Sequence, residues 1–376
     1  MHEGIKNVLK KTFQNKIIIK QIDQLEFFEQ IYNKTNIFYW LKLIPYKREI
    51  ERVLFSPFMN LLNNNFIIKL TSKFINRDVK KATLAIAVGG PHIISLKYGT
   101  ACHRLQFEHL HSSLKNNGIP VLNLSVGSCC PYLDSTTKFK KNEKKIFIKW
   151  IKSADFTSVR DLTAKRIYNE LGFNLDLVPC TVLLALDQRK SHKLSKKPRI
   201  IINFMEKWPL SEEVMTFKVD PDIKIWIESV EKLISKYKNN YKFTFVCHSK
   251  NEMDIAKKRF PNFKRIFPKT KSDYVKLTYD TAACIAGRIH CAIPLASAGI
   301  PSMVIGTDTR MNTAKAIGIN CFDIKNVTEK KLENEFLRMI KKAGPIRKTY
   351  FRNKNLAFKL YSNIIKKYYL KSTYPI

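Results

Sequence analysis

Short apolar runs alternate with amphipathic stretches from residue 84 onward. The apolar runs predict strands, which in the first half of the chain lie at 84–88, 120–126, 155–159 and 175–178. Apolar residues at helical spacing predict the intervening helices at 100–116, 141–152 and 162–171. Strands separated by helices of about 10 to 15 residues are typical of a parallel, doubly wound sheet.

The same alternation resumes after residue 199. Strands are predicted at 199–204, 243–247, 265–267, 283–286 and 301–305, with helices at 222–237, 252–260 and 273–279. The segment before residue 80 has a weaker pattern, from which we expect a strand at 17–19 and a helix at 27–43. The chain therefore contains two α/β halves.

A polar, charged stretch separates these halves. Residues 186–198 lack periodic apolar positions and are typical of an interdomain linker. We predict one Rossmann-like domain at 1–185, a second at 199–345, and a C-terminal helix at 346–376. This helix either packs back across both domains or lies on anionic lipid, and packing is favoured. The predicted fold is α/β and GT-B-like: two Rossmann-like parallel-sheet domains face a cleft, and the C-terminal helix packs across them.

The charge balance is strongly basic, with 67 Lys and Arg against 31 Asp and Glu, for a net charge of +36 over 376 residues. Such a charge attracts nucleic acid, anionic membranes or acidic substrates. The excess Lys is scattered, however, so a compositional bias of the whole chain explains it as well. Because the sequence has no aromatic nucleic-acid-binding strand and no zinc finger, we expect no specific nucleic-acid partner.

Cysteine usage points to a reducing compartment. The eight cysteines form no C-x-x-C pair and lie at no zinc-binding spacing, so we expect no metal site. Cys247 and Cys284 lie inside apolar strands, where a thiol behaves as a small hydrophobic group.

The amino end lacks the apolar core of a signal peptide, and no apolar run is as long as the roughly 18 residues that a membrane-spanning helix needs. We expect a cytoplasmic protein, at most peripheral to an anionic membrane.

The segment 283–305 carries the clearest chemical signal. An apolar strand stops at Gly287, Arg288 and His290 open a short helix that Gly299 closes, and a second strand follows. In such a βαβ unit the helix amino end lies at the carboxyl edge of the sheet, where its free N–H groups favour an anion. Arg288 and His290 are therefore candidates for an anion site, although ordinary surface chemistry at a helix start remains an alternative.

Four short pieces, spread over about residues 84 to 320, occur in an order and spacing that resemble the polysaccharide pyruvyl transferase family. They are Gly89-Gly90, Ser158-Val159-Arg160-Asp161, Cys247-His248-Ser249, and Gly287-Arg288-Ile289-His290 with the following Gly306-Thr307-Asp308-Thr309-Arg310. The resemblance implies a GT-B-like fold, phosphoenolpyruvate as the donor substrate, and transfer of a pyruvyl group to a sugar as a ketal. It implies no other cofactor. The acceptor is expected on the N-terminal domain and the donor on the C-terminal domain.

The residues suit that chemistry. Arg288 and Arg160 are the candidates for binding the donor's carboxylate and phosphate, because a guanidinium group meets either with two parallel hydrogen bonds. His290 is the candidate acid, since histidine exchanges protons near neutral pH. These three are the predicted catalytic residues.

Further substrate-binding candidates each have a structural alternative. They are Gly89, Gly90, Asp161, His248, Asp308 and Arg310. The glycines also suit a tight turn, His248 a surface position, and Asp308 an ion pair with Arg310. For Asp161 the favoured alternative is a cap on the helix that follows. The chain also has Pro179-Cys180 where many members of the family have Pro-Asp, so it lacks that carboxylate.

The predicted function is transfer of a pyruvyl group from phosphoenolpyruvate to a sugar hydroxyl of a polysaccharide or glycan precursor, lipid-linked precursors included. A GT-B glycosyltransferase that uses a nucleotide sugar is the alternative, because the same anion site suits a diphosphate. A third hypothesis, a basic protein that only binds nucleic acid or membrane, rests on the charge alone.

Overall fold

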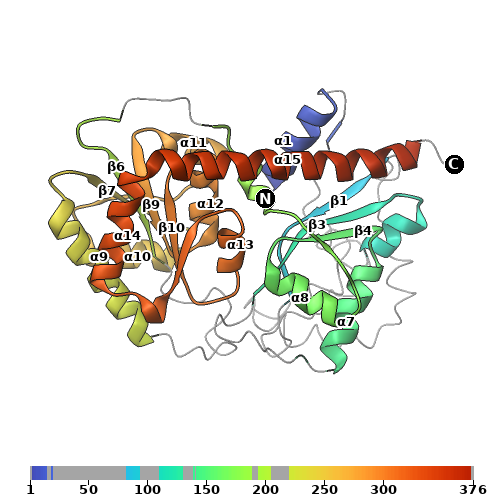
Figure 1. The fold of residues 1–376 in the computed structure, drawn as a ribbon, viewed down its shortest axis with the longest axis horizontal. Coiled ribbons are helices and arrows are strands. Elements are labelled where there is room, and N and C mark those ends of the chain that lie inside the picture. Colours follow the sequence, from blue (N-terminus) through green and yellow to red (C-terminus); the bar gives the residue numbers. More distant parts are fainter. Residues whose placement is uncertain are drawn as a thin grey trace, which may run out of the picture.

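The computed structural model describes residues 2–14, 18–19, 82–93, 110–129, 139, 141–188, 194–204 and 220–373. Two parallel sheets lie side by side, one in each half of the chain, and the long helix α15 (Ala343–Thr373) runs along both (Figure 1). The helix expected at 27–43 and residue 17 lie outside the described residues, and residues 18 and 19 do not form the strand expected at 17–19. The two predicted α/β halves are confirmed, whereas the exact domain boundaries stay a prediction.

The N-terminal sheet is built around one fully buried strand. This sheet is parallel, with β1-β3-β4-β5 as its main order and β2 pairing with the far end of β3. Its strands are β1 (Ala85–Val88), β2 (Pro91–Ile93), β3 (Val121–Ser128), β4 (Phe156–Val159) and β5 (Asp176–Leu177). Helices α7 (Lys141–Lys152) and α8 (Leu162–Glu170) bury Phe147, Trp150 and Tyr168 in its core. The predicted strands from residue 84 and the helices at 141–152 and 162–171 are therefore found within a few residues of their expected ends, whereas of the helix expected at 100–116 only 110–116 lie among the described residues, as helix.

The C-terminal sheet has six parallel strands in the order β11-β10-β9-β6-β7-β8. They are β6 (Arg199–Asn203), β7 (Lys242–Val246), β8 (Lys264–Ile266), β9 (Thr281–Ala286), β10 (Ser302–Gly306) and β11 (Asn320–Asp323). The central strands are apolar along nearly their whole length because helices cover both faces of such a sheet. Their carboxyl ends form the edge at which the βαβ unit places its helix.

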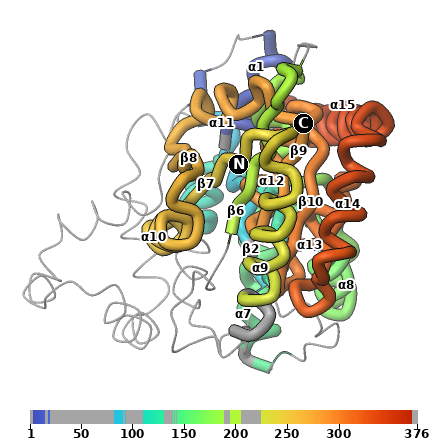
Figure 2. Tube along the Cα trace, turned by 90° about the vertical axis from the view of Figure 1, so that its left-hand side faces the viewer, coloured from blue at the N-terminus to red at the C-terminus, as the bar shows by residue number. Residues whose placement is uncertain are grey.

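The helices of this half are α9 (Asp220–Tyr237), α10 (Lys250–Arg259), α11 (Lys271–Thr278), α12 (Ile289–Ser297), α13 (Met311–Lys315) and α14 (Glu329–Lys341). Helix α12 is buried along almost its entire length, from Ile289 to Ser297. The sequence pattern predicted α9 to α12 but did not predict β11, α13 or α14. Viewed from the side in Figure 2, α14 and α15 lie together at one margin of the molecule.

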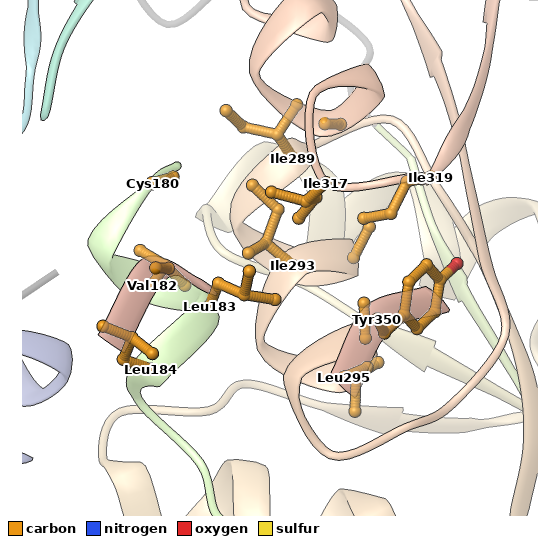
Figure 3. Packing of buried hydrophobic residues seen from close by; sticks show 14 of the residues in the cluster. Cys180, Val182, Leu183, Leu184, Ile289, Ile293, Leu295, Ile317, Ile319 and Tyr350 are labelled. Carbon is orange, nitrogen blue, oxygen red and sulfur yellow. The ribbon is translucent and has the colours of Figure 1, made fainter. Parts of the chain in front are cut away.

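One hydrophobic core joins the two halves. The short helix η3 (Thr181–Leu184) packs its apolar side chains against α12, as Figure 3 shows for Val182 and Leu183 facing Ile293. Helix α1 (His2–Thr12) covers the other side of η3, and Asn7 donates hydrogen bonds to the Leu184 and Ala185 carbonyls. The amino end, the connection between the halves and α12 therefore form one packed unit.

Helix α15 is hydrogen-bonded to both halves. Near its start, the Tyr350 hydroxyl bonds to Ser302 in the C-terminal sheet. Farther along, the Tyr361 hydroxyl donates to the Pro179 carbonyl at 2.6 Å, and the Tyr368 hydroxyl donates to the Asp155 carbonyl at 3.2 Å. The predicted packing of the C-terminal helix across both domains is confirmed.

Candidate active site

The turn from β9 into α12 is fixed by Asn203 at the end of the neighbouring strand β6. The Asn203 carbonyl accepts the Gly287 N–H at 2.8 Å, and its side-chain Oδ1 accepts the Arg288 N–H at 2.9 Å. Arg288 is the extended residue just before α12, and its side chain makes no capping hydrogen bond. The first N–H groups of α12 therefore face the carboxyl edge of the sheet, an arrangement that favours an anion.

A pocket opens at this edge. Residues on two consecutive βα connections line it: Gly287, Arg288, Ile289, His290, Val304, Gly306, Asp308, Arg310 and Met311. The pocket thus brings together Arg288, His290, Asp308 and Arg310, four of the candidates that the sequence singled out. The other five do not line it.

Arg288 is held by a buried carboxylate. Its Nε donates to Oε1 of Glu252, whose side chain is only 3% exposed. Burial acts to raise the pKa of Glu252, but the hydrogen bonds from His248 and the positive charge of Arg288 outweigh it and keep that pKa below its usual value. Glu252 is therefore ionised at neutral pH, and it forms an ion pair with Arg288 at the rim of the pocket.

The His290 side chain presents a buried nitrogen without a partner. Although the residue as a whole is partly exposed, its Nε2 atom is buried and has no hydrogen-bond partner among the described residues. Burial, with the charges of Arg160 and Arg310 adding to it, lowers the pKa of His290 well below the usual value. The imidazole is therefore neutral near pH 7, and its Nε2 faces the pocket that His290 lines.

A hydrogen-bond chain supports the main chain of His290. The Tyr274 hydroxyl donates to the His290 carbonyl at 3.0 Å and lies 2.6 Å from Nε2 of His248. Because the hydroxyl proton points to the carbonyl, His248 must supply the proton of the shorter bond from its Nε2. His248 is therefore part of the support behind the pocket, with a side chain that is 20% exposed.

Asp308 and Arg310 form an ion pair with each other, which is the structural alternative that the sequence analysis named for Asp308. Arg310 Nε and Nη2 donate to the two Asp308 carboxylate oxygens at 2.9 and 3.3 Å, and the Arg310 N–H adds a third bond at 2.8 Å. Burial opposes the charge of Arg310, but the Asp308 carboxylate more than compensates and raises the pKa of Arg310. This neutral, hydrogen-bonded ion pair forms one wall of the pocket.

Arg160 lies behind the pocket, within the N-terminal half. Its side chain is fully buried, and its guanidinium group packs on Gly127 so closely that a β-carbon there would come within 2.3 Å of Nε. Its Nη1 approaches the Cys180 sulfur at 3.8 Å. The structure thus separates Arg160 from the pocket lining, although its charge still acts on His290.

Asp161 caps α8, the role that the sequence favoured. Its carboxylate accepts the Ala164 N–H at 2.8 Å and hydrogen bonds from the N–H and hydroxyl of Ser128. Ser128 also bonds to Thr309 of the other half, at 2.9 Å. Burial raises the pKa of Asp161 even though these hydrogen bonds lower it. Asp161 therefore belongs to the contact between the halves.

Gly89 and Gly90 join β1 to β2 without reversing the chain, because both strands run parallel to β3 and pair with successive parts of it. Both glycines have positive φ values, 65° and 101°. The Gly89 N–H bonds to the Leu124 carbonyl, and the Gly90 carbonyl accepts from Gly127, so this connection stays paired with β3. The glycines therefore form an irregular strand connection rather than the tight turn named as their structural alternative.

Three residues of this region were not predicted: Asn203, Glu252 and Tyr274. Asn203 is the polar residue that ends the apolar strand β6 at its carboxyl end, which is where α/β proteins place ligand-binding groups. Glu252 follows Ser249 by three residues, a spacing that signals a helix start. Nothing in the local sequence around Tyr274 indicates its contact with His290.

The described residues contain no cluster of three or more His, Cys, Asp or Glu side chains arranged to hold a metal ion. Within the same ranges, no helix combines the length and the apolar character needed to cross a bilayer.

Solved structures with the same architecture include enzymes of nucleotide-sugar metabolism. The S. aureus MnaA structure with UDP has a TM-score of 0.55 at 13% identity and covers 98% of this chain and 94% of that chain. The UDP-GlcNAc 2-epimerase from Neisseria meningitidis bound to UDP-GlcNAc has a TM-score of 0.51 at 14% identity, covering 82% and 81%. At such low identity these likenesses show the fold alone, and the fold is GT-B-like as predicted.

The sequence comparisons identify the family. No curated protein sequence matches this chain. The family model for polysaccharide pyruvyl transferase, however, matches residues 1–309, a range that includes the β9–α12 turn with Arg288 and His290. The chain therefore belongs to the polysaccharide pyruvyl transferase family.

Proposed function

We propose that this protein transfers a pyruvyl group from phosphoenolpyruvate to a sugar hydroxyl of a polysaccharide or glycan precursor, forming a pyruvate ketal and releasing phosphate. One observation carries the proposal: a single pocket combines the amino end of α12, the side chain of Arg288 and the unpartnered Nε2 of His290. Membership of the pyruvyl transferase family supports the reaction class.

The pocket suits a donor with two anionic groups. Phosphoenolpyruvate carries a carboxylate and a phosphate, and Arg288 has guanidinium N–H groups beyond the one that Glu252 occupies. The N–H groups at the start of α12 add a second anion-binding element. Arg310 is already paired with Asp308, so this pair is neutral as a whole and offers the donor no free guanidinium fork.

His290 is proposed to move the proton. Its pKa is lowered in the ligand-free protein, and a bound anionic donor opposes the charges of Arg160 and Arg310 and so raises it. Protonated His290 then delivers a proton to the methylene carbon of the enol, which becomes a methyl group. A sugar hydroxyl attacks the neighbouring carbon, the bond to phosphate breaks, and a second hydroxyl closes the ketal. One hydroxyl proton restores His290 and the other leaves with phosphate.

The remaining assignments follow from this reaction. The sugar acceptor, lipid-linked or not, is proposed to approach from the N-terminal half, with the donor bound to the C-terminal half. We propose that the protein is cytoplasmic and at most peripheral to a membrane. Nucleotide-sugar transfer is the competing function, because structures with the same fold hold UDP or UDP-GlcNAc.

The test is phosphate release from phosphoenolpyruvate by the purified full chain, across a panel of glycan and lipid-linked acceptors. We expect acceptor-dependent release that is lost in Arg288→Ala and His290→Ala. Arg166→Ala is the matched control, since Arg166 is an exposed arginine on α8 that pairs with Glu170. Turnover of a nucleotide sugar without any binding of phosphoenolpyruvate would replace the proposal by the glycosyltransferase alternative.

A further inference from the structure

Glu252 is the centre of a buried hydrogen-bond network beneath the pocket. One carboxylate oxygen, Oε1, accepts from Arg288 Nε. The other, Oε2, accepts the His248 N–H at 2.7 Å and the Asn203 side-chain amide at 3.2 Å. Every donor around this 3% exposed carboxylate comes from an element at the carboxyl edge of the sheet. A buried charge with this many fixed partners has one well-defined orientation.

Arg288 is therefore held at two points, by Asn203 and Glu252, and these two residues also hydrogen-bond to each other. Asn203 Oδ1 accepts the Arg288 main-chain N–H, and Glu252 accepts the side-chain Nε–H. A guanidinium group has one N–H on Nε and four on its two terminal nitrogens. Because Glu252 occupies the Nε side, the edge formed by the two terminal nitrogens is left for a ligand.

We propose that Glu252 is a positioning residue that turns the terminal edge of the Arg288 guanidinium group toward the pocket, so that an anionic donor is bound end-on. The identity of this donor rests on the proposed function; the orientation of Arg288 does not. Without Glu252, the arginine side chain loses its fixed direction and the donor must order it on binding, which weakens the complex.

Three variants of the full chain test this role. Glu252→Ala removes the acceptor of Arg288 Nε. Glu252→Gln keeps the side-chain length and one accepting oxygen, but it sets an NH2 group against either Arg288 Nε or the donors of His248 and Asn203. Ser249→Ala is the structural control, because the Ser249 hydroxyl caps the same helix at the Glu252 N–H but has no contact with Arg288. The measurements are the Arg288 Nε–H signal in NMR spectra, assigned by its absence in Arg288→Lys, and calorimetric binding of phosphoenolpyruvate.

We expect the Nε–H signal to persist in Ser249→Ala and to shift or broaden in Glu252→Ala and Glu252→Gln. Phosphoenolpyruvate binding should weaken by about tenfold or more in Glu252→Ala, weaken in Glu252→Gln as well, and stay within about threefold of the parent in Ser249→Ala. An unchanged signal in Glu252→Ala, or equal loss of binding in Ser249→Ala, would overturn the positioning role. A parent that does not bind phosphoenolpyruvate at all would instead count against the proposed function, and the NMR signal would still decide the role of Glu252.

Discussion

Gly299 lies directly beneath Phe351, where α15 crosses the end of α12. A β-carbon on Gly299 would come within 2.7 Å of Phe351 Cζ, and the glycine has a left-handed backbone with φ of 89°. We expect Gly299→Ala to lower the free energy of unfolding by at least about 2 kcal/mol, from backbone strain and overpacking together. Urea denaturation of both proteins measures this difference.

Gly172 provides the matched control for that substitution. Its φ is 87°, but a β-carbon there would meet nothing within 4 Å. Gly172→Ala should therefore cost only the backbone strain, about 1 kcal/mol. If both variants lose the same free energy of unfolding, α15 must shift enough to accommodate the added methyl group.

Gly127 tests whether the position of Arg160 matters for the reaction. Since a β-carbon at Gly127 would overlap the Arg160 guanidinium group, Gly127→Ala should displace that group while leaving the arginine in the chain. We expect turnover to fall by about tenfold or more, because the charge acting on His290 moves. The assay is acceptor-dependent phosphate release, with circular dichroism to confirm folding. Full activity in a folded variant would assign Arg160 a purely structural role.

Tyr274 connects His248 to the His290 main chain. Tyr274→Phe removes the hydroxyl that donates to the His290 carbonyl, so the start of α12 loses one of its supports. We expect a fall in kcat of about tenfold, with a smaller change in KM for phosphoenolpyruvate. Tyr279→Phe, at a half-exposed tyrosine that follows α11, should leave both constants unchanged. A Tyr274→Phe enzyme with parental kcat would show that this hydrogen bond is dispensable.

His111 makes stability depend on pH. Burial lowers its pKa from 6.5 to about 4, with the Asp155 carboxylate acting against this change. Above pH 6.5 the imidazole is neutral in both states. As the pH falls from 6.5 toward 4, the unfolded chain gains a proton that the folded chain does not, so the free energy of unfolding falls by about 3 kcal/mol.

The comparison with His111→Asn isolates this effect from the other titrating groups. Denaturant unfolding of both proteins at several pH values should give curves that are parallel above pH 6.5 and converge or cross below it, because only the parent carries the histidine. A constant difference down to pH 4 would rule out the neutral, buried state of His111.

The sequence pattern was sufficient for most of the fold. Apolar strands such as 283–286 and amphipathic helices such as α7 are set by local periodicity, and they were found within a few residues of their predicted ends. Strand β11 and helices α13 and α14 were not predicted. In β11, the residues Asn320 to Asp323 are mostly half-buried and mixed in polarity, so packing against β10 rather than local preference makes them a strand.

The site could be predicted only in part, because its residues come together through topology. Arg288 and His290 share one local motif, which is why the sequence indicated them. Glu252 lies just after β7, and Arg288 lies just after β9. The two meet because β6 is the strand between them, and Asn203 at the end of β6 bonds to both residues. No spacing along the chain encodes that contact, and the roles of all these residues in catalysis stay a prediction.

Helix α15 is one continuous, stiff helix that connects the two halves. Its anchors at Tyr350 and Tyr368 are about 27 Å apart along a continuous helix, and each is bonded to a different sheet domain. Swinging the halves apart would bend this helix or break those bonds, and turning one half about the helix axis would break its bonds to one of the two halves. A bulky glycan that reaches the pocket should therefore meet two halves that keep their relative orientation.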